Sequence, residues 1–231
     1  MSLMNYILKI AGKNNFSIDD RISTSYIIQL CIKYGFMMIR GKLLSVGNRK
    51  IASSVFVGSR VKTYEKKYLS IGAKTKIHDG VVLNALSCEG ISIGENCVIG
   101  SRSIMECTGG LSTLGKGIKI GDRTTFNNDC FFGAAGGIEI GSDVVAGQYV
   151  RFHSENHNYD DLEILIKDQG VIHKGIKIGN NCWIGSGVVF LDGSELGDGC
   201  VVAANAVVTK AFPENSVIGG VPAKILKYRG E

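Results

Sequence analysis

Proline is nearly absent from this sequence, with 2 residues in 231, and aromatic residues make up only 8% of it. Disordered linkers are usually rich in proline, so its scarcity beside 31 glycines favours ordered, repeated tight turns. Lysine and arginine form no continuous run and are not interleaved with aromatic residues. At a net charge of +5, this argues against nucleic-acid binding.

Long apolar runs and a signal peptide are also missing. Lys33 and Arg40 interrupt the most apolar stretch, which leaves it too short to cross a bilayer. The chain opens without the charged, apolar and small-residue leader of a secreted protein, and its seven cysteines include no CxxC pair. We therefore expect reduced thiols in a cytoplasmic protein, with peripheral contact at the inner membrane as an additional location.

What the sequence has instead is a six-residue period. Counting on by six from Ile178 meets an apolar residue at each of five further steps, and similar counts start at residues 71, 93, 120 and 140. A second column, four residues after the first, is mostly small. Residues two or four apart in a strand share a face, so both columns are predicted to fill a narrow interior. The second column contains Thr75, Val81, Cys97, Ser103, Thr124, Cys130, Val144, Val150, Cys182, Val188, Ser194, Cys200 and Ala206.

The residue after each large apolar residue is usually Gly, Asn or Asp, which suits a corner at which φ becomes positive. An antiparallel sandwich also has short strands and frequent turns, but it does not keep a six-residue phase over many rungs. Four cysteines belong to the small column, so we interpret them as packing residues rather than redox centres or zinc ligands. The sequence thus predicts an all-β parallel β-helix.

The longest interruption of the period, an excess of 20 residues, lies between Phe152 and Ile178. Insertions in a solenoid form loops on one face, which is often the binding face. Before the repeat, residues 23–44 have helical periodicity and are expected either to cap the open end of the solenoid or to lie on a membrane surface. The expected organisation is a helical cap at 1–50, a β-helix at 51–212 with a loop insertion at 153–175, and a basic tail at 213–231.

Four segments resemble the hexapeptide-repeat acyltransferases: IKIGNNCWIGSGVV at 176–189, LGDG at 196–199, NAVVTK at 205–210 and GGVPAK at 219–224. The chain is most similar to the sugar O-acetyltransferases of the galactoside and maltose, nodulation, and capsule or colanic-acid groups. The resemblance covers residues 71–227. It implies a left-handed triangular β-helix, acetyl-CoA as the acyl donor, no metal, and a homotrimer with active sites between its subunits.

In that family, an extended loop at the place of the insertion carries a histidine general base, and the matching residue in RFHSENHNYDD (151–161) is His157. Imidazole titrates near neutral pH and can accept the proton of a sugar hydroxyl. Partners that could fix its tautomer are Glu155, Asp160, Asp161 and backbone carbonyls. With His153 and His173 it also resembles the zinc site of carbonic anhydrases that share this solenoid, but the spacing departs from theirs. His153 follows the inward Phe152 and is expected to point outward, where it lines the substrate site or is merely exposed.

The resemblance also assigns residues that bind the two substrates. Asn127 aligns with an asparagine that contacts the acceptor, and Asp129 is expected to face the acceptor too, although a structural ladder of Asn and Asp at the corners is the alternative. Ser186 is expected at the thioester carbonyl and the lysines at the CoA phosphates. The full set expected to contact acetyl-CoA is Trp183, Ser186, Ala204, Thr209, Lys210, Lys224 and Lys227.

We therefore expect an acetyl-CoA-dependent O-acetyltransferase that acts by direct transfer on a hydroxyl of a sugar or polysaccharide precursor. An antibiotic O-acetyltransferase and a non-catalytic β-helix scaffold are the alternatives. The identity of the acceptor is not encoded in any motif of the chain.

Overall fold

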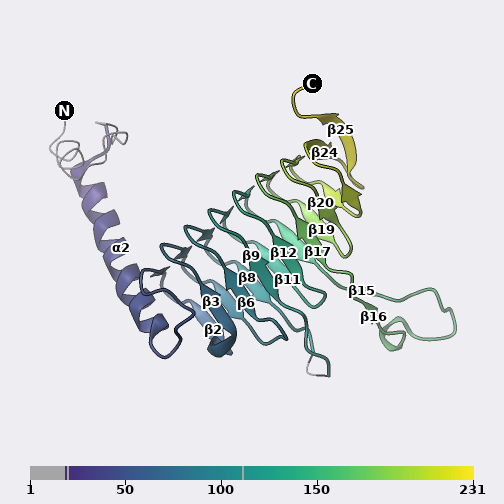
Figure 1. The fold of residues 1–231 in the computed structure, drawn as a ribbon, viewed down its shortest axis with the longest axis horizontal. Helices are drawn as coiled ribbons and strands as arrows, with labels where there is room; N and C mark the ends of the chain where they lie inside the picture. The colour runs from purple at the N-terminus through teal and green to yellow at the C-terminus, as the bar shows by residue number, and fades with distance from the viewer. Residues whose placement is uncertain (1–18, 20, 111) are drawn as a thin grey trace.

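Short parallel strands wind into a three-sided β-helix in the computed structural model, which describes residues 19, 21–110 and 112–231 (Figure 1). Each strand pairs with the strand in the same place of the neighbouring coil, so every side of the prism is a sheet. The left-handed hexapeptide-repeat β-helix expected from the sequence is confirmed.

Three faces make up the prism. The first face contains β1 (Phe56–Val57), β4 (Lys76–Ile77), β7 (Val98–Ile99), β10 (Thr125–Phe126), β13 (Val145–Ala146), β18 (Trp183–Ile184), β21 (Val201–Val202), β24 (Ser216–Gly219) and the antiparallel β25 (Lys224–Tyr228). The second face contains β2 (Lys62–Tyr64), β5 (Val82–Asn84), β8 (Ile104–Glu106), β11 (Phe131–Gly133), β14 (Arg151–His153), β19 (Val189–Leu191) and β22 (Val207–Val208). The third face contains β3 (Leu69–Ile71), β6 (Ile91–Ile93), β9 (Ile118–Ile120), β12 (Ile138–Ile140), β17 (Ile176–Ile178), β20 (Glu195–Leu196) and β23 (Ala211–Phe212).

The interior of the prism is filled by the two columns that the period predicts. Members of both columns are buried, including Thr75 and Cys97 of the small column. On the second face, successive phenylalanine rings stack: the centroids of Phe132 and Phe152 are 5.0 Å apart, and those of Phe152 and Phe190 are 4.9 Å apart. The same inward position thus recurs from coil to coil because the backbone register is parallel.

Corner glycines are needed for close approach between coils rather than for positive φ. A Cβ on Gly141 would lie 2.7 Å from Asn180 Oδ1 and 2.8 Å from the carbonyl carbon of Gly179. Positive φ occurs two residues after this glycine, at Asp143 (61°), and at the equivalent Asn181 (54°) of the next coil. The expectation that the residue directly after the large apolar residue adopts positive φ is therefore wrong at these corners, because the contact between coils constrains that position instead.

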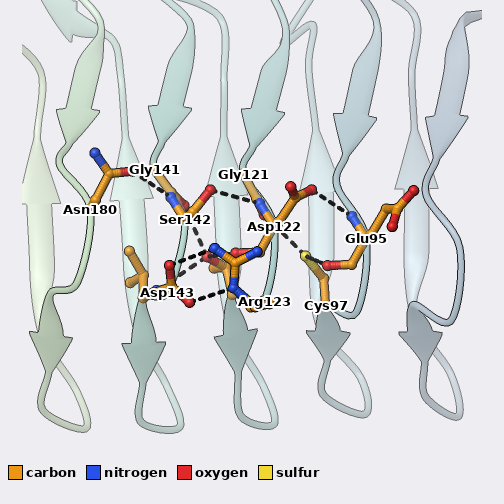
Figure 2. A network of polar contacts seen from close by, with 11 residues as sticks. Glu95, Cys97, Gly121, Asp122, Arg123, Gly141, Ser142, Asp143 and Asn180 are labelled. Carbon is orange, nitrogen blue, oxygen red and sulfur yellow. Dashed lines mark hydrogen bonds and ion pairs between the residues drawn. The ribbon is translucent and has the colours of Figure 1, made fainter.

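A polar ladder joins the coils along the edge between the third and first faces, here called the Asp122 edge (Figure 2). The backbone N–H of Glu95 donates to Asp122 Oδ1 at 2.8 Å, and that of Asp122 donates to Ser142 Oγ at 3.0 Å. The N–H of Ser142 then donates to Asn180 Oδ1 at 2.9 Å. Each coil therefore supplies a side-chain acceptor for a corner N–H of the coil before it.

Helix α2 (Thr24–Ser45) precedes the β-helix and begins after Ser23, whose hydroxyl accepts the N–H of Tyr26. Its buried residues are Met37 and Gly41, and a Cβ on Gly41 would overlap the carbonyl oxygen of Val55. The helix therefore rests on the first coil through its C-terminal half, while its N-terminal half extends away from the prism (Figure 1). Among the described residues, none of the helices has the length and hydropathy to span a bilayer.

Two 3₁₀ helices, η1 (Lys66–Tyr68) and η2 (Ile166–Asp168), lie in connections between strands. The longest connection, between β14 and β17, contains η2 and a two-stranded antiparallel hairpin, β15 (Asn156–His157) and β16 (Val171–Ile172). This hairpin projects from the side of the prism (Figure 1). We call the edge from which it leaves, between the second and third faces, the His157 edge.

Candidate active site

The inserted loop is anchored to the prism at both of its ends. At its start, buried Ser154 donates its hydroxyl to the carbonyl of Gly133 at 2.9 Å and accepts the N–H of Gly136 at 3.0 Å. At its end, the N–H groups of Lys174 and Gly175 donate to the carboxylate of Asp192. The neck of the loop is therefore held in place, as a loop that positions a catalytic side chain requires.

Contacts within the loop keep its distal part ordered. Gln169 Nε2 donates to the carbonyls of Asp161 and Ile164, both at 2.7 Å, and Asn158 Nδ2 donates to the carbonyl of Gln169 at 3.0 Å. His157 lies on β15 opposite Val171, and its side chain is exposed. The predicted general base is thus presented to solvent by an ordered hairpin.

A pocket of about 210 Å³ lies at the base of the loop on the His157 edge. Its walls include Phe131, Glu106 and His153, which come from three adjacent strands of the second face. In the register of these strands, Gly133 lies between Glu106 and His153. Because glycine has no side chain there, a gap is left between the carboxylate and the imidazole, and this gap forms the pocket.

Two ionisable groups at this pocket have defined partners. His153 is half-buried, with its ring centroid 5.5 Å from that of Phe131, and its pKa is lowered by burial and then by the charge of Arg151. Its imidazole is therefore neutral at pH 7. The carboxylate of Glu155 contacts His173 Nε2 at 2.7 Å across the neck of the loop. Of the partners considered for the tautomer of His157, Glu155 is thus engaged by another histidine.

The predicted acceptor residues Asn127 and Asp129 lie elsewhere, on the edge between the first and second faces, here called the Asn127 edge. Asn127 is exposed, and its Oδ1 accepts the N–H of Asn128 at 2.8 Å. Both carboxylate oxygens of Asp129 are bound by Arg102, at 2.7 and 2.6 Å. On this edge it is Asn128 that accepts an N–H from the neighbouring coil, that of Ser101 at 2.9 Å, so Asn127 is free of that structural role.

The residues assigned to acetyl-CoA divide between two edges. Ser186 and Ala204 occupy successive coils of the Asn127 edge, joined where the N–H of Asn205 donates to the carbonyl of Ser186 at 2.9 Å. Trp183, on the adjoining first face, is 61% exposed between Val145 and Val201.

The four remaining residues of this set lie near the C-terminal end of the prism. Lys224 and Lys227 lie exposed on β25, with Lys224 opposite Gly219. Thr209 and Lys210 instead follow β22 at the His157 edge, where Lys210 Nζ lies 5.7 Å from the centroid of the Phe212 ring. Within one chain, the second face therefore separates His153, His157, Thr209 and Lys210 from the other candidates.

Three pocket residues, Phe131, Glu106 and Gly133, and the pair formed by Glu155 and His173 were not predicted from the sequence. The first three lie at outward positions of their strands. The six-residue period marks only the inward positions, so it gives no functional signal for these residues. His173 and Glu155 lie at opposite ends of the loop and meet only because it folds back on itself. Among the described residues, no three His, Cys, Asp or Glu side chains are grouped so that they could hold a metal ion.

Comparison with known proteins identifies the repeat. Residues 175–210 match the model of the bacterial transferase hexapeptide, and residues 90–125 match that of the hexapeptide repeat of succinyl-transferase. A Mycobacterium tuberculosis protein named as an acetyltransferase is 37% identical over 112 residues, which are 48% of this chain and 37% of that protein. An Escherichia coli K12 protein named for O-acetyl transfer in lipopolysaccharide biosynthesis is 33% identical over 125 residues, 51% of this chain and 64% of its own length.

This chain therefore spans less than two thirds of the length of these relatives. A solved structure confirms the fold: a variant of the N-acyltransferase AntD from Bacillus cereus, in complex with dTDP-4-amino-4,6-dideoxyglucose and coenzyme A, has a TM-score of 0.54. The match is 15% identical and covers 83% of this chain and 90% of that one. The chain therefore contains hexapeptide repeats at residues 90–125 and 175–210, folds as a β-helix, and is similar over about half of its length to proteins named as acetyltransferases.

Proposed function

We propose that this protein is an acetyl-CoA-dependent O-acetyltransferase that acts on a hydroxyl of a sugar or polysaccharide precursor. The observation that carries the proposal is the ordered hairpin that exposes His157, together with the pocket at the base of the same loop, which Ser154 and Glu155 help to line. A pocket with an aromatic wall (Phe131) and polar groups (Glu106, His153) fits a sugar ring, since its apolar face can pack on the aromatic side chain while its hydroxyls form hydrogen bonds.

The proposed reaction is a direct transfer. His157 accepts the proton of the acceptor hydroxyl as its oxygen attacks the thioester carbonyl of acetyl-CoA. The negative charge that develops on the carbonyl oxygen is stabilised by a hydrogen bond, for which Ser186 is the candidate donor. The C–S bond then breaks, CoA leaves as a thiolate, and the proton held by His157 returns to it.

The position of the candidates on two edges supports an active site that is completed by a second chain. His157 and His153 belong to the His157 edge, whereas Asn127 and Ser186 belong to the Asn127 edge on the other side of the second face. If the His157 edge of one subunit faces the Asn127 edge of the next in a homotrimer, the base, the acceptor residues and the CoA residues come together. We include this trimer in the proposal.

The histidine base is tested by replacing His157 with Ala and following acetyl transfer from radiolabelled acetyl-CoA to maltose, galactosides and nucleotide-linked sugars. Loss of a positioned general base is expected to lower the rate by about 10² to 10⁴-fold. The binding of CoA, measured by titration calorimetry, is expected to be unchanged because the imidazole acts on the acceptor.

A matched control is His78→Ala, since His78 lies on a coil near α2 and outside the inserted loop. This control is expected to transfer acetyl groups at the wild-type rate. A His157→Ala rate within a few-fold of wild type would contradict the assignment of the base. A wild-type protein that binds no CoA would contradict the enzyme and favour a scaffold.

A further inference from the structure

An unpartnered apolar stripe runs along α2. Its members are spaced by three or four residues and are each between 51 and 69% exposed: Ile28, Ile32, Phe36, Ile39, Leu43 and Val46. At 3.6 residues per turn they share one side of the helix, away from Met37 and Gly41, which pack on the first coil. A contiguous stripe of this kind is unusual for a surface that meets only water.

Positive charge accompanies this stripe. Arg40 projects on one flank of it and Lys42 on the other, while Lys33, on the same flank as Arg40, pairs with Asp79 at 3.7 Å. The sequence contains no Asp or Glu between Asp20 and Glu65. The first 50 residues contain eight Lys or Arg and two Asp, a net charge of +6, whereas the whole chain has +5, so residues 51–231 carry −1. The positive charge of the protein is therefore concentrated on the segment that exposes the apolar stripe.

This charge pattern distinguishes between two partners for the stripe. In a coiled coil with further copies of the chain, Ile32, Phe36, Ile39 and Leu43 would form the seam, and the flanking positions would be filled by Lys33, Arg40 and Lys42. Flanking positions of this kind carry opposite charges in stable coiled coils, and like charges there repel. An anionic surface, in contrast, is attracted by the same cations.

We propose that α2 lies on an anionic phospholipid bilayer, with the stripe from Ile28 to Val46 among the acyl chains and Arg40 and Lys42 at the lipid phosphates. The helix lies on the membrane and does not cross it. Because the side that packs on the first coil is opposite the stripe, the β-helix stays in water while α2 is bound. The proposal concerns the helix alone and holds with or without acetyltransferase activity.

The test is sedimentation of the full chain with vesicles of equal parts phosphatidylglycerol and phosphatidylcholine, compared with vesicles of phosphatidylcholine alone. We expect binding to the anionic vesicles that is at least ten-fold stronger and weakens in high salt. The double substitution Phe36→Asp and Ile39→Asp is expected to weaken it by at least ten-fold. Arg40→Gln with Lys42→Gln is expected to weaken it by about 30-fold, since each basic residue near an anionic surface contributes about five-fold.

A matched control places the same aspartates at two exposed leucines of the inserted loop, Leu162→Asp and Leu165→Asp, and is expected to bind vesicles like the wild type. Circular dichroism verifies that each variant is folded. Absence of sedimentation of the wild-type chain, or equal binding to both kinds of vesicle, overturns the proposal. It is also overturned if the Phe36 and Ile39 double variant dissociates into smaller species by light scattering, because the stripe is then covered by another copy of the chain.

Discussion

Cysteine shows how burial in the β-helix controls the chemistry of single residues. Five of the seven thiols are buried, and desolvation raises the pKa of Cys107 to about 12 and that of Cys130 to about 11. Cys200 differs, because its contact with the Cys182 thiol lowers its pKa, but its side chain is completely buried. Thiolate formation and access are both needed for reaction, so none of these three is available as a nucleophile.

The native protein should therefore react with a dithionitrobenzoate thiol reagent at two cysteines, Cys31 and Cys88, which are exposed. After denaturation in guanidinium, all seven should react. The measurement is the number of thionitrobenzoate equivalents released before and after denaturation. A Cys31→Ser, Cys88→Ser double variant provides the control and should release none while folded. Rapid release of more than two equivalents from the native chain would contradict the packing role of the inward cysteines.

Among the structural elements, the close stacking of the coil corners limits which residues can occupy a corner position. Gly141 has no room for a Cβ, whereas Gly35 in α2 has open space around its own. Replacing Gly141 with Ala forces the corner away from Asn180 and is expected to lower the free energy of unfolding by about 1–3 kcal/mol, as overpacking does. Replacing Gly35 with Ala is expected to raise it by about 0.5–1 kcal/mol, through the higher helix propensity of alanine.

Urea unfolding followed by circular dichroism measures both changes. The Gly35→Ala protein serves as the control, since it adds the same methyl group where nothing obstructs it. If Gly141→Ala is as stable as wild type, the close approach between coils does not explain the glycine at this corner.

At the scale of the whole molecule, the proposed active site needs more than one chain. The His157 edge and the Asn127 edge border opposite sides of the second face, so one prism cannot bring their residues to a common substrate. Multi-angle light scattering is expected to give three times the chain mass of 24.8 kDa. Mixing inactive His157→Ala subunits with inactive Ser186→Ala subunits should restore part of the activity, because some mixed interfaces then contain both intact residues.

A stable monomer with full activity would contradict the shared site. Subunits that exchange but never regain activity in the mixture would show that His157 and Ser186 act from the same chain. In that case the hairpin would have to reach around the second face, which its anchored neck at Ser154 and Asp192 opposes.

The repeated part of the molecule can be predicted from the amino-acid sequence alone. A six-residue period is local, so Ile178 and Cys182 reveal their inward direction by spacing alone, and the break after Phe152 locates the inserted loop. The segments at 176–224 added the resemblance to the hexapeptide-repeat acyltransferases. The glycine corners were located correctly but for the wrong reason, since the residues that exclude a side chain at Gly141 are Gly179 and Asn180 of the neighbouring coil, 38 and 39 residues away in the sequence.

Which outward residues meet depends on how the coils stack and cannot be predicted from the spacing of residues in the sequence. Glu106 and His153 lie two coils apart, and the gap between them exists because the strand of the intervening coil places Gly133 in their row. Insertions of different lengths separate these coils, so no fixed spacing predicts the row. The exposed apolar side of α2 is a second example. Helical periodicity shows which residues are apolar, but it does not show which of them pack on the first coil. Contacts between distant segments depend on how coils stack, and the period within each coil does not encode that.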